Sequence, residues 1–368
     1  MKILHYISGI SPTIGGIEIF ILNIYEEFKK HGHEIEILTR YVDRRTKMFK
    51  MISEAGIKVH SLNVEHLSLK SSVRFKKSVE LFFNNHKDYD VLHSHCIEDP
   101  CVIHYAKKNG IKKVGLHVHS YRKDNISLKR IIKGIVLHSN CKKGDFFLSC
   151  SSEVGESTYP LRYNNIRVVK NGIDSEKFEY DENTRNEYRK LLKLEDCFVI
   201  CHVGRFNQIK NHWFLIDTFN VVLNGNLSSR LLLIGDGELK ESIYKKCKKL
   251  KIEDKVLFLG DRSDVNKLLQ AADVFVLPSF KEGFGIVTIE AQAAGLNTIV
   301  SKDSVSDSIN ITNLVEFISL DENEYKWANT ILKYSEGYNR KKMSTIIKRA
   351  GYDNKNTVID LIDIYNQS

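Results

Sequence analysis

The chain has few of the features that mark fibrous, disordered or membrane-spanning proteins. Only four of its 368 residues are proline and 21 are glycine, which excludes collagen-like and proline-rich low-complexity sequences. No apolar run approaches the roughly 18 residues that a membrane-spanning helix needs. The first residues also lack the long apolar core and the cleavage site of a secretory signal. We therefore expect a soluble, cytoplasmic protein.

Disulfide and metal patterns are also weak. Seven cysteines are present, an odd number without repeated close spacing, which is not the pattern of a disulfide framework. One group of potential metal ligands stands out, formed by His93, His95, Cys96, Cys101 and His104. Successive residues of a strand point to opposite faces, so His93 and His95 share a side that Cys96 does not. We predict ordinary packing at a strand end rather than a metal site.

The excess positive charge lies in the first half of the chain. Of the net charge of +9, residues 1–170 contribute 28 Lys and Arg against 17 Asp and Glu, whereas residues 171–368 contribute 27 against 29. Such a bias points to an anionic partner, which could be nucleic acid, a membrane surface or a phosphorylated substrate. The alternative is a set of ordinary solvated lysine faces.

Short aliphatic runs alternate with longer amphipathic stretches along the whole chain. This alternation predicts an α/β protein with parallel sheets covered by helices on both faces. The expected strands span residues 2–7, 34–39, 57–60, 90–94, 112–118 and 145–150, then 197–204, 230–235, 255–259, 273–277, 297–301 and 314–318. Helices are expected near 17–31, 70–86, 99–108 and 127–139, and near 323–334, 339–349 and 354–366. Two series of six strands predict two doubly wound, Rossmann-like domains facing a cleft, with ligands at the carboxyl ends of the strands.

The most specific passage is FKEGFGIVTIEAQAAG, residues 280–295. It follows an apolar strand and predicts a glycine turn and then a helix from about Ile286. The free backbone N–H groups at such a helix start favour hydroxyls and anionic oxygens. Glu282 in the loop and Glu290 in the helix could accept hydrogen bonds from polyol hydroxyls, which suits a sugar nucleotide. A capped helix with two incidental glutamates is the alternative.

A second candidate is the segment GRFNQIK, residues 204–210, which follows the expected strand VICHVG. Arg205 and Lys210 should therefore lie at the ligand edge of a sheet. A guanidinium can hold a diphosphate through two N–H groups, whereas an ammonium acts as a compact charge. Both would stabilise the negative charge that develops as a nucleoside diphosphate leaves. The alternative is a surface pair of cations on a loop.

Two glycine pairs also follow strands. Gly15 and Gly16 precede a helix, at a position where glycine lets backbone N–H groups approach a phosphate or sugar closely. A Gly-x-Gly at residues 235–237 could be mistaken for a dinucleotide fingerprint. It lacks the third glycine in the correct frame, so no nicotinamide cofactor is expected.

These passages occur in the order that is typical of family 4 of the retaining, GT-B-fold glycosyltransferases, which the chain resembles from residue 1 to about 335. The matching segments are PTIGGIEIFILNIY, DVLHSHC, VGLHVHSYRK, FFLSCSSEVGES, VVKNGID, ICHVGRFNQIKNH, LLLIGDGELKESI, VLFLGDRSDV and the EGFG passage with Glu290. Within the family, EAQAAGLNTIVS followed by LVEFISLDENEYKWANTIL is most similar to the branch that builds exopolysaccharide and capsule.

The resemblance implies an activity and a domain plan. It implies transfer of a sugar, with retention at the anomeric carbon, from a nucleotide sugar that we expect to be UDP-linked. The acceptor would be a hydroxyl of a glycan or of a polyprenyl-diphosphate-linked glycan, and no metal ion or other cofactor is expected. The implied domains are an acceptor-side domain at 1–170, a nucleotide-sugar domain at 171–351 and a final helix at 352–368 that crosses back to the first. A sugar-nucleotide 2-epimerase of the same fold and a non-catalytic glycan-binding relative are the alternatives.

The resemblance also assigns roles to residues. It implies catalytic roles for His119, Arg205, Lys210 and Glu282, with His119 near the reacting sugar. His117 shares a strand face with His119 and is an alternative for that position, and His95 is a further candidate for contact with the acceptor. The donor-binding residues that it implies are Gly15, Gly16, Gly204, Arg205, Lys210, Arg262, Glu282, Gly283, Phe284, Gly285, Ile286 and Glu290. Among these, Arg262 would lie near the nucleobase and Glu290 near the ribose.

The basic residues of the first half gather in two stretches. Lys70, Arg74 and Lys77 form one stripe of a predicted helix, and the second group follows directly after His119. The second group is Arg122, Lys123, Lys129, Arg130 and Lys133, interleaved with aliphatic residues. Each basic residue near an anionic surface adds on the order of 1 kcal/mol at most. We therefore predict that the first domain binds the inner face of the cell membrane and acts there on a lipid-linked acceptor.

The basic stretches are also compatible with a purely structural role. The helices could be ordinary amphipathic covers whose apolar faces pack on a sheet. Nucleic acid is not expected as a partner, because no aromatic residues alternate with the cations as stacking platforms.

Overall fold

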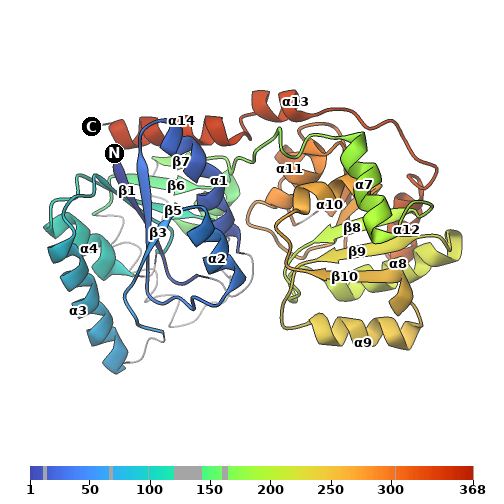
Figure 1. The fold of residues 1–368 in the computed structure, drawn as a ribbon, viewed down its shortest axis with the longest axis horizontal. Helices are drawn as coiled ribbons and strands as arrows, with labels where there is room; N and C mark the ends of the chain where they lie inside the picture. Colours follow the sequence, from blue (N-terminus) through green and yellow to red (C-terminus); the bar gives the residue numbers. More distant parts are fainter. Residues whose placement is uncertain are drawn as a thin grey trace. The chain divides into compact units, whose positions relative to one another are not determined.

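The computed structural model describes residues 1–10, 15–65, 69–97, 99–119, 143–159, 165–302 and 304–367. The chain divides into two compact units (Figure 1). Unit 1 comprises Met1–Gly172 together with Asn354–Ser368, and unit 2 comprises Ile173–Asp353. The domain boundaries that we predict near 170 and 351 lie close to these. No helix in the described part of the chain is both long and apolar enough to cross a membrane.

Unit 1 contains a parallel sheet. Within the described residues it has seven strands in the order β3-β2-β1-β4-β5-β6-β7. The strands are β1 (Lys2–Ile7), β2 (Glu34–Thr39), β3 (Lys58–Ser61), β4 (Val91–Ser94), β5 (Lys113–Val118), β6 (Phe146–Ser149) and β7 (Ile166–Val168). The order reverses between β1 and β4, and parallel sheets bind ligands at such switch points, outside the carboxyl ends of the strands. The ends of β1, β4 and β5 therefore define the ligand edge of unit 1.

Within the described residues, six helices belong to unit 1, and Figure 1 labels most of them around the sheet. They are α1 (Gly16–Lys30), α2 (Lys47–Glu54), α3 (Leu69–Asn85), α4 (Pro100–Lys108), α6 (Ser152–Thr158) and α14 (Asn354–Asn366). The last helix is distant in sequence but belongs to this unit because its apolar residues recur at helical spacing. Val358, Leu361, Ile364 and Tyr365 lie in the same buried cluster as residues of α1 such as Phe28.

Unit 2 contains a second parallel sheet, in the order β10-β9-β8-β11-β12-β13. Its strands are β8 (Val199–Val203), β9 (Arg230–Ile234), β10 (Val256–Gly260), β11 (Val274–Leu277), β12 (Asn297–Ser301) and β13 (Val315–Ile318). Strands covered on both faces are apolar without interruption, and the run Val274–Leu277 is buried at all four positions. The order reverses between β8 and β11, so the loops after these two strands define the ligand edge of unit 2.

Helices also surround the unit 2 sheet. They are α7 (Glu182–Leu192), α8 (His212–Gly225), α9 (Lys240–Leu250), α10 (Val265–Ala271), α11 (Ile286–Ala293), α12 (Glu324–Leu332) and α13 (Ser344–Arg349), with 3₁₀ turns at Glu253–Lys255 and Asp307–Ile309. Trp327 of α12 is fully buried and joins Phe219 of α8 and Ile299 of β12 in one apolar core. Each unit therefore has a hydrophobic core of its own.

The predicted fold class, two doubly wound α/β domains, is confirmed, and every predicted strand is present with small shifts at its ends. The count of six strands in the first half is wrong, because β7 adds a seventh. This strand has three residues at the sheet edge, two of them exposed, and is too short to show an alternation. The short helices α2 and α6 were also not expected, and the helix predicted at 339–349 is helical only over Ser344–Arg349. The helix predicted at 127–139 lies outside the described residues.

Candidate active-site residues

The loop after β8 carries Gly204, Arg205 and Lys210, and a second glycine-containing loop packs against it. A Cβ atom on Gly235 would lie 2.2 Å from the carbonyl oxygen of Gly204, and one on Gly237 would lie 2.6 Å from the carbonyl oxygen of Phe206. Both glycines also have positive φ angles, 130° and 157°, which L-residues with side chains rarely adopt. The Gly-x-Gly at 235–237 is thus explained by close contact between two backbones rather than by cofactor binding.

The structure brings Lys210 and Glu282, two of the predicted site residues, together. Lys210 Nζ lies 2.7 Å from Glu282 Oε1, and their side chains are only 16% and 11% exposed. The backbone N–H of Glu282 donates to the carbonyl of Ser304 at 2.8 Å, which holds the loop in place. A partly buried pair of this kind is ordered and keeps both charges at the ligand edge.

Arg205 has a different environment from Lys210. Its side chain is 47% exposed and its guanidinium lies 3.3 Å from Glu238 Oε2, which is itself exposed. Ion pairs between exposed groups contribute little free energy. Arg205 is therefore able to exchange this partner for an anionic ligand at small cost.

The glycine turn and the helix that follows it are placed as predicted. α11 begins at Ile286, and Gly285 precedes it with a φ angle of 73°. A Cβ atom on Gly285 would also lie 2.9 Å from a methyl carbon of Val305. Both the positive φ angle and this close contact therefore favour glycine at the position. Within the described residues, no side chain caps the start of α11, which leaves its first N–H groups available to a ligand. Phe284 is buried and stacks on Tyr352, with ring centroids 5.4 Å apart.

Glu290 lies inside α11 and is almost completely buried, at 8% exposure. Its carboxylate has no hydrogen-bond partner in the part of the chain that the structure describes. Burial raises the pKa of Glu290 to about 8, against a smaller opposing effect of the Lys177 charge. Burying a carboxyl group without partners is unfavourable. Such a group is therefore a strong candidate for a ligand contact.

Arg262 follows β10 and is held by its own neighbour. Its Nε and one terminal nitrogen donate to the two oxygens of Asp264 at 2.7 and 2.6 Å. Asp264 also accepts a hydrogen bond from the hydroxyl of Tyr188 at 2.8 Å. One edge of the Arg262 guanidinium is thus hydrogen-bonded to Asp264, whereas its planar face stays available to stack on an aromatic base.

In unit 1, Gly15 and Gly16 lie at the start of α1, and the first turn also contains a buried carboxylate. A Cβ atom on Gly15 would lie 2.3 Å from Glu18 Oε2, so only glycine lets this side chain fold over the helix start. Glu18 is 5% exposed, and sequence reasoning missed it. An acidic residue in the first turn of a helix that begins with a glycine pair is the signal that could have indicated it.

Five histidines from three neighbouring strands form a row on one face of the unit 1 sheet. They are His5 in β1, His93 in β4, His95 after β4, His117 in β5 and His119 after β5. His5 is the register partner of His93, and alternation along each strand places the others on the same face. Ring centroids of His5, His93 and His95 are 4.5 to 5.2 Å apart, and those of His117 and His119 are 4.0 Å apart.

The hydrogen bonds of this histidine row form two separate chains. In the first, His5 Nδ1 contacts His95 Nε2 at 2.9 Å, and His95 Nδ1 contacts His119 Nε2 at 2.7 Å. In the second, the hydroxyl of Tyr365 contacts His93 Nδ1 at 2.5 Å, and His93 Nε2 contacts His117 Nδ1 at 3.1 Å. The first chain ends at the partly buried His119, and the second ties α14 to the sheet.

Two groups of three histidines are close enough to suggest a metal site. Within each group, one nitrogen atom of each ring lies within 4.8 Å of those of the other two rings. The first group is His5, His93 and His95, and the second is His95, His117 and His119. The rings of the first group are nearly parallel, with interplanar angles of 16° to 21°, so their lone pairs do not converge on a point. Nitrogen contacts of 2.7 to 3.1 Å are hydrogen-bond distances, shorter than the ~3.3 Å between two nitrogens on tetrahedral zinc. The geometry is that of hydrogen-bonded imidazoles.

Burial keeps these imidazoles neutral. It lowers the pKa of His5 and of His119 to about 3, and that of His93, His95 and His117 well below the usual value. Phe20 of α1 covers part of the row, with its ring 5.2 to 5.8 Å from three of the imidazoles. The row therefore offers hydrogen bonds without net charge.

The histidine row changes two expectations. Both ring nitrogens of His95 are bonded to other histidines, which leaves neither nitrogen available for a further ligand in this arrangement. His117 is fully buried and bonded to His93, whereas His119 lies at the open end of its strand. Of the two residues considered near the reacting sugar, His119 therefore has the accessible position. His5 was missed, because a single histidine in an apolar strand gives no signal by itself.

The group of candidate metal ligands in the sequence does not come together as a set. Cys96 Sγ donates to Asp99 Oδ2 at 3.2 Å, and the Tyr6 hydroxyl donates to the same oxygen at 2.6 Å. Arg40 Nε lies 3.6 Å from that oxygen. Asp99 is thus a buried, satisfied carboxylate at the ligand edge of unit 1, and sequence reasoning missed it as well.

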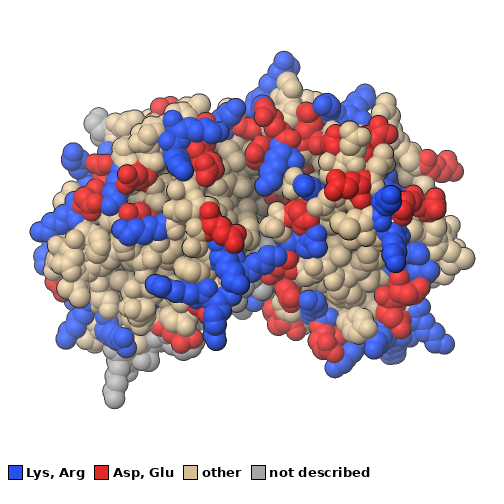
Figure 2. Space-filling view, in the orientation of Figure 1, with Lys and Arg blue, Asp and Glu red and all other residues tan. Residues whose placement is uncertain are grey.

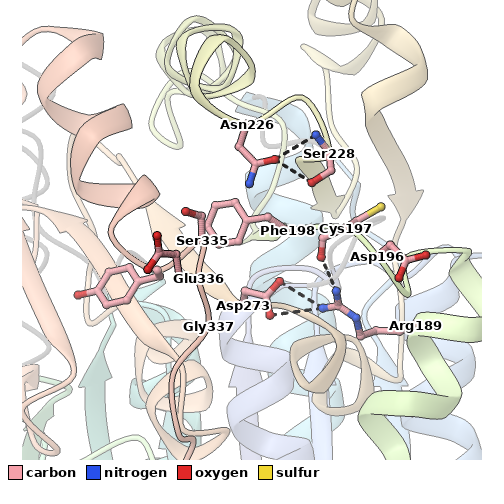
Figure 3. A pocket seen from close by; sticks show the side chains of 11 residues that line it. Arg189, Asp196, Cys197, Phe198, Asn226, Ser228, Asp273, Ser335, Glu336 and Gly337 are labelled. Atoms are coloured by element: carbon pink, nitrogen blue, oxygen red, sulfur yellow. Dashed lines mark hydrogen bonds and ion pairs between the residues drawn. The ribbon is translucent and has the colours of Figure 1, made fainter.

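A cavity of about 270 Å³ lies at the opposite edge of the unit 2 sheet (Figure 3). Residues just before β8 and β11, such as Phe198 and Asp273, line it. Asp273 accepts hydrogen bonds from Arg185, from Arg189 and from the backbone N–H of Val199. These bonds join the helix α7 to the amino ends of the strands, so the charges have a structural role here.

We expect unit 1 to lose stability steeply in mild acid. A histidine whose folded pKa is lowered contributes stability above its unfolded pKa of about 6.5, and this contribution is lost as pH falls below that value. Each such histidine changes the free energy of unfolding by up to about 1.4 kcal/mol per pH unit, and five lie in the row. Urea unfolding followed between pH 7.5 and 5 should show a steep fall. A flat profile would mean that the folded row accepts protons.

Comparison with known proteins matches one family profile to each unit. The family profile described as Glycosyltransferase Family 4 matches residues 14–177, and the profile described as Glycosyl transferases group 1 matches residues 183–352. EpsF of Bacillus subtilis (strain 168), itself named only provisionally as a glycosyltransferase, is 26% identical over 100% of this chain and 97% of its own length. An Escherichia coli UDP-Gal:α-D-GlcNAc-diphosphoundecaprenol α-1,3-galactosyltransferase is 27% identical, covering 82% of this chain and 79% of that protein.

A solved structure shows the same fold over the whole chain. HepE from Anabaena, in complex with UDP and glucose, superimposes with a TM-score of 0.79 at 16% identity and covers 100% of both chains. The two family profiles together account for most of this sequence, one on each unit. The chain therefore belongs to the family 4 glycosyltransferases with the GT-B fold.

Proposed function

We propose that this glycosyltransferase moves a sugar, with retention, from a UDP-linked donor to a glycan hydroxyl during surface polysaccharide synthesis. The acceptor would be a glycan or a polyprenyl-diphosphate-linked glycan. The observation that carries the proposal is the ligand edge of unit 2, where the Lys210–Glu282 ion pair, the exposed Arg205 and the unpartnered Glu290 come from two neighbouring loops and α11. The names of the relatives support the donor and acceptor classes, since one uses UDP-Gal and a diphosphoundecaprenol-linked sugar and another structure contains UDP and glucose.

In the proposed complex the donor would occupy the edge from the ribose to the sugar. Glu290 would accept hydrogen bonds from the ribose hydroxyls, and Arg205 would bind the diphosphate through two N–H groups. Lys210 would turn toward the diphosphate, which leaves Glu282 free to accept hydrogen bonds from hydroxyls of the sugar. The ion pair present without ligand (2.7 Å) thus keeps both groups in place until the donor exchanges one partner for another.

The chemical step follows from this placement. The bond between the anomeric carbon and the diphosphate oxygen breaks, and the acceptor oxygen forms a bond to that carbon on the same face. The acceptor proton passes to the leaving diphosphate. Arg205 and Lys210 would stabilise the negative charge on that diphosphate, and His119 of unit 1 would donate a hydrogen bond near the reacting sugar. The proposal uses no metal ion and no carboxylate nucleophile.

The assignment of Glu290 to the ribose predicts pH-dependent donor binding. An ionised carboxylate accepts two hydroxyl hydrogen bonds, but burial raises the pKa of Glu290 to about 8. Binding must therefore release a proton, so the affinity for UDP should rise up to about tenfold per pH unit below that pKa. Calorimetry between pH 7 and 8.5 in buffers of different ionisation enthalpy would measure both effects. Glu290→Gln should bind UDP more weakly and without this pH dependence.

The matched control for this prediction is Glu282→Gln, which leaves Glu290 in place. It should keep the pH dependence of UDP binding and lose mainly turnover and discrimination between sugars. An affinity of the wild-type protein that is constant over this pH range would contradict the ribose assignment.

The proposed reaction is tested with a panel of UDP-sugars and lipid-linked or soluble glycan acceptors. A glycoside product with the α or β configuration of the donor should appear only when an acceptor is present. Arg205→Ala should reduce transfer by roughly 10²-fold or more, and EDTA should leave most of the activity. A new nucleotide sugar formed without any acceptor would instead support the 2-epimerase. Activity that disappears with EDTA and returns with Mg²⁺ or Mn²⁺ would contradict the metal-free proposal.

The proposal extends to the inner membrane surface, through an exposed part of α3. The inward face of α3 packs as expected, with Phe75, Val79 and Phe83 buried. On the opposite face, a set of residues lies within an arc of about 100° around the helix axis, because each residue of an α-helix is rotated by about 100° from the one before it. This α3 surface consists of Val73 and Leu81, which are 58% and 62% exposed, and of the exposed Arg74 and Lys77.

Exposed aliphatic and basic side chains together suit the boundary between anionic headgroups and lipid tails. Charge by itself is a weaker sign, since acidic side chains lie among the basic ones on the face drawn in Figure 2. The side chain of Lys70, and the whole group Arg122, Lys123, Lys129, Arg130 and Lys133, lie outside the described residues.

Flotation with anionic vesicles tests the α3 surface. The wild-type protein should float with the vesicles at low salt and less at high salt. The combined change Val73→Ser, Arg74→Glu, Lys77→Glu and Leu81→Ser should abolish flotation while UDP still binds. Lys248→Glu with Lys249→Glu makes the same change in charge on unit 2 and should leave flotation intact. A wild-type protein that stays unbound at low salt would contradict the membrane proposal.

A further inference from the structure

The hydrogen bonds of the first chain of the histidine row restrict which ring nitrogen of His119 carries the proton. A neutral imidazole has one N–H group and one lone pair, so each contact between two imidazoles needs a donor on one ring and an acceptor on the other. His5, His95 and His119 are linked by contacts of 2.9 and 2.7 Å. All their protons in this chain must therefore point in the same direction.

The buried end of the chain decides that direction. His5 Nε2 is completely buried and has no hydrogen-bond partner within the described part of the chain. If the protons pointed toward His5, its Nε2 would be a buried N–H group without an acceptor, which folded proteins avoid most strictly. If they point toward His119, His5 Nε2 is an unfilled lone pair, which is tolerated more often. His5 Nδ1 then donates to His95 Nε2, and His95 Nδ1 donates to His119 Nε2.

His119, at the other end of this hydrogen-bonded chain, is compatible with protons that point toward it. His119 Nε2 accepts from His95, so the single proton of the His119 ring is on Nδ1. His119 is only partly buried, and its Nδ1 has no partner among the described residues. Burial also lowers the pKa of His119 to about 3, so the ring stays neutral at physiological pH.

From this geometry we infer that His5 and His95 are positioning residues that hold His119 as the Nδ1–H tautomer. His119 then presents a hydrogen-bond donor, and not a general base, to an oxygen atom of the bound ligand. This role rests on the proposed function, in which that oxygen belongs to the donor sugar or to its phosphate. The tautomer itself follows from the histidine row alone and is independent of which sugar is transferred.

The second chain provides a control within the same row. His93 is completely buried and stacks against the buried His95 at 4.5 Å, but its nitrogens contact Tyr365 and His117 and not His119. A change at His93 should therefore disturb packing and the attachment of α14 without changing the proton on His119. A merely structural role for the whole row would make His93 and His95 equivalent.

The tautomer can be measured directly in the full-length protein. Long-range ¹H–¹⁵N spectra of histidine side chains distinguish Nδ1–H from Nε2–H rings, and the His119→Gln variant identifies the signals of His119. We expect the Nδ1–H pattern for His119 in the protein without ligand. An Nε2–H pattern would overturn the inference, whether or not the protein transfers sugar.

Substitutions at position 95 test the cause. Asn and Asp each place a polar atom close to the position of His95 Nδ1, but Asn can donate there and Asp can only accept when ionised. His95→Asn should keep the Nδ1–H pattern of His119 and kcat within a few fold. His95→Asp should remove the Nδ1–H pattern, because the His119 proton moves to Nε2 or because His119 gains a second proton. It should also lower kcat by roughly 10²-fold with little change in UDP affinity.

The control variant His93→Asn should lower the melting temperature and leave the His119 spectrum unchanged. If His95→Asp leaves the His119 spectrum unchanged, or if His93→Asn alters it as much, the inference is wrong. If no donor in the panel supports transfer by the wild-type protein, the proposed function fails, while the spectra still decide the tautomer.

Discussion

Parallel pairing of β1, β4 and β5 places five histidines on one face of a sheet, and the ligand edge of unit 1 depends on that register. A shift of one residue in any of the three strands would turn its imidazoles to the opposite face. The register is fixed by the apolar residues that alternate with the histidines, such as Leu4, Leu92 and Leu116, which are completely buried. Burial of these apolar residues in the core therefore also brings together histidines as far apart in the sequence as His5 and His119.

The two ligand edges use different kinds of polar group. Unit 2 has charged groups, of which the Lys210–Glu282 pair is held at 2.7 Å and Arg205 is exposed. Unit 1 has imidazoles that burial keeps neutral, and its carboxylate Asp99 is satisfied by Tyr6 and Cys96. The fold explains this difference, because the row of histidines lies beneath α1 and α14, whereas the loops after β8 and β11 are closer to solvent.

Much of this arrangement could be predicted from the sequence, because continuous apolar runs and glycine turns are local signals. The passage from Glu282 to Glu290 carries its own turn, helix start and carboxylates, and the structure places them as expected. His5, Glu18 and Asp99 could not be found in this way, because each is a single residue whose neighbours come from distant strands or from a helix start. Likewise, the sequence around Tyr365 shows only an ordinary amphipathic pattern, and the contact of the Tyr365 hydroxyl with His93 becomes evident only in the structure.

The contrast between charged and neutral edges fits the demands of the proposed reaction. As the bond to the diphosphate breaks, negative charge grows on the phosphate, while the sugar gains positive, oxocarbenium-like character. Cations such as Arg205 and Lys210 would stabilise the first charge, but a cation beside the anomeric carbon would oppose the second. A neutral donor avoids this conflict, since it can orient an oxygen of the sugar without repelling the ring. Burying the histidine row lowers the pKa of each imidazole, so in the proposed reaction unit 1 would supply hydrogen bonds to the sugar without adding positive charge beside it.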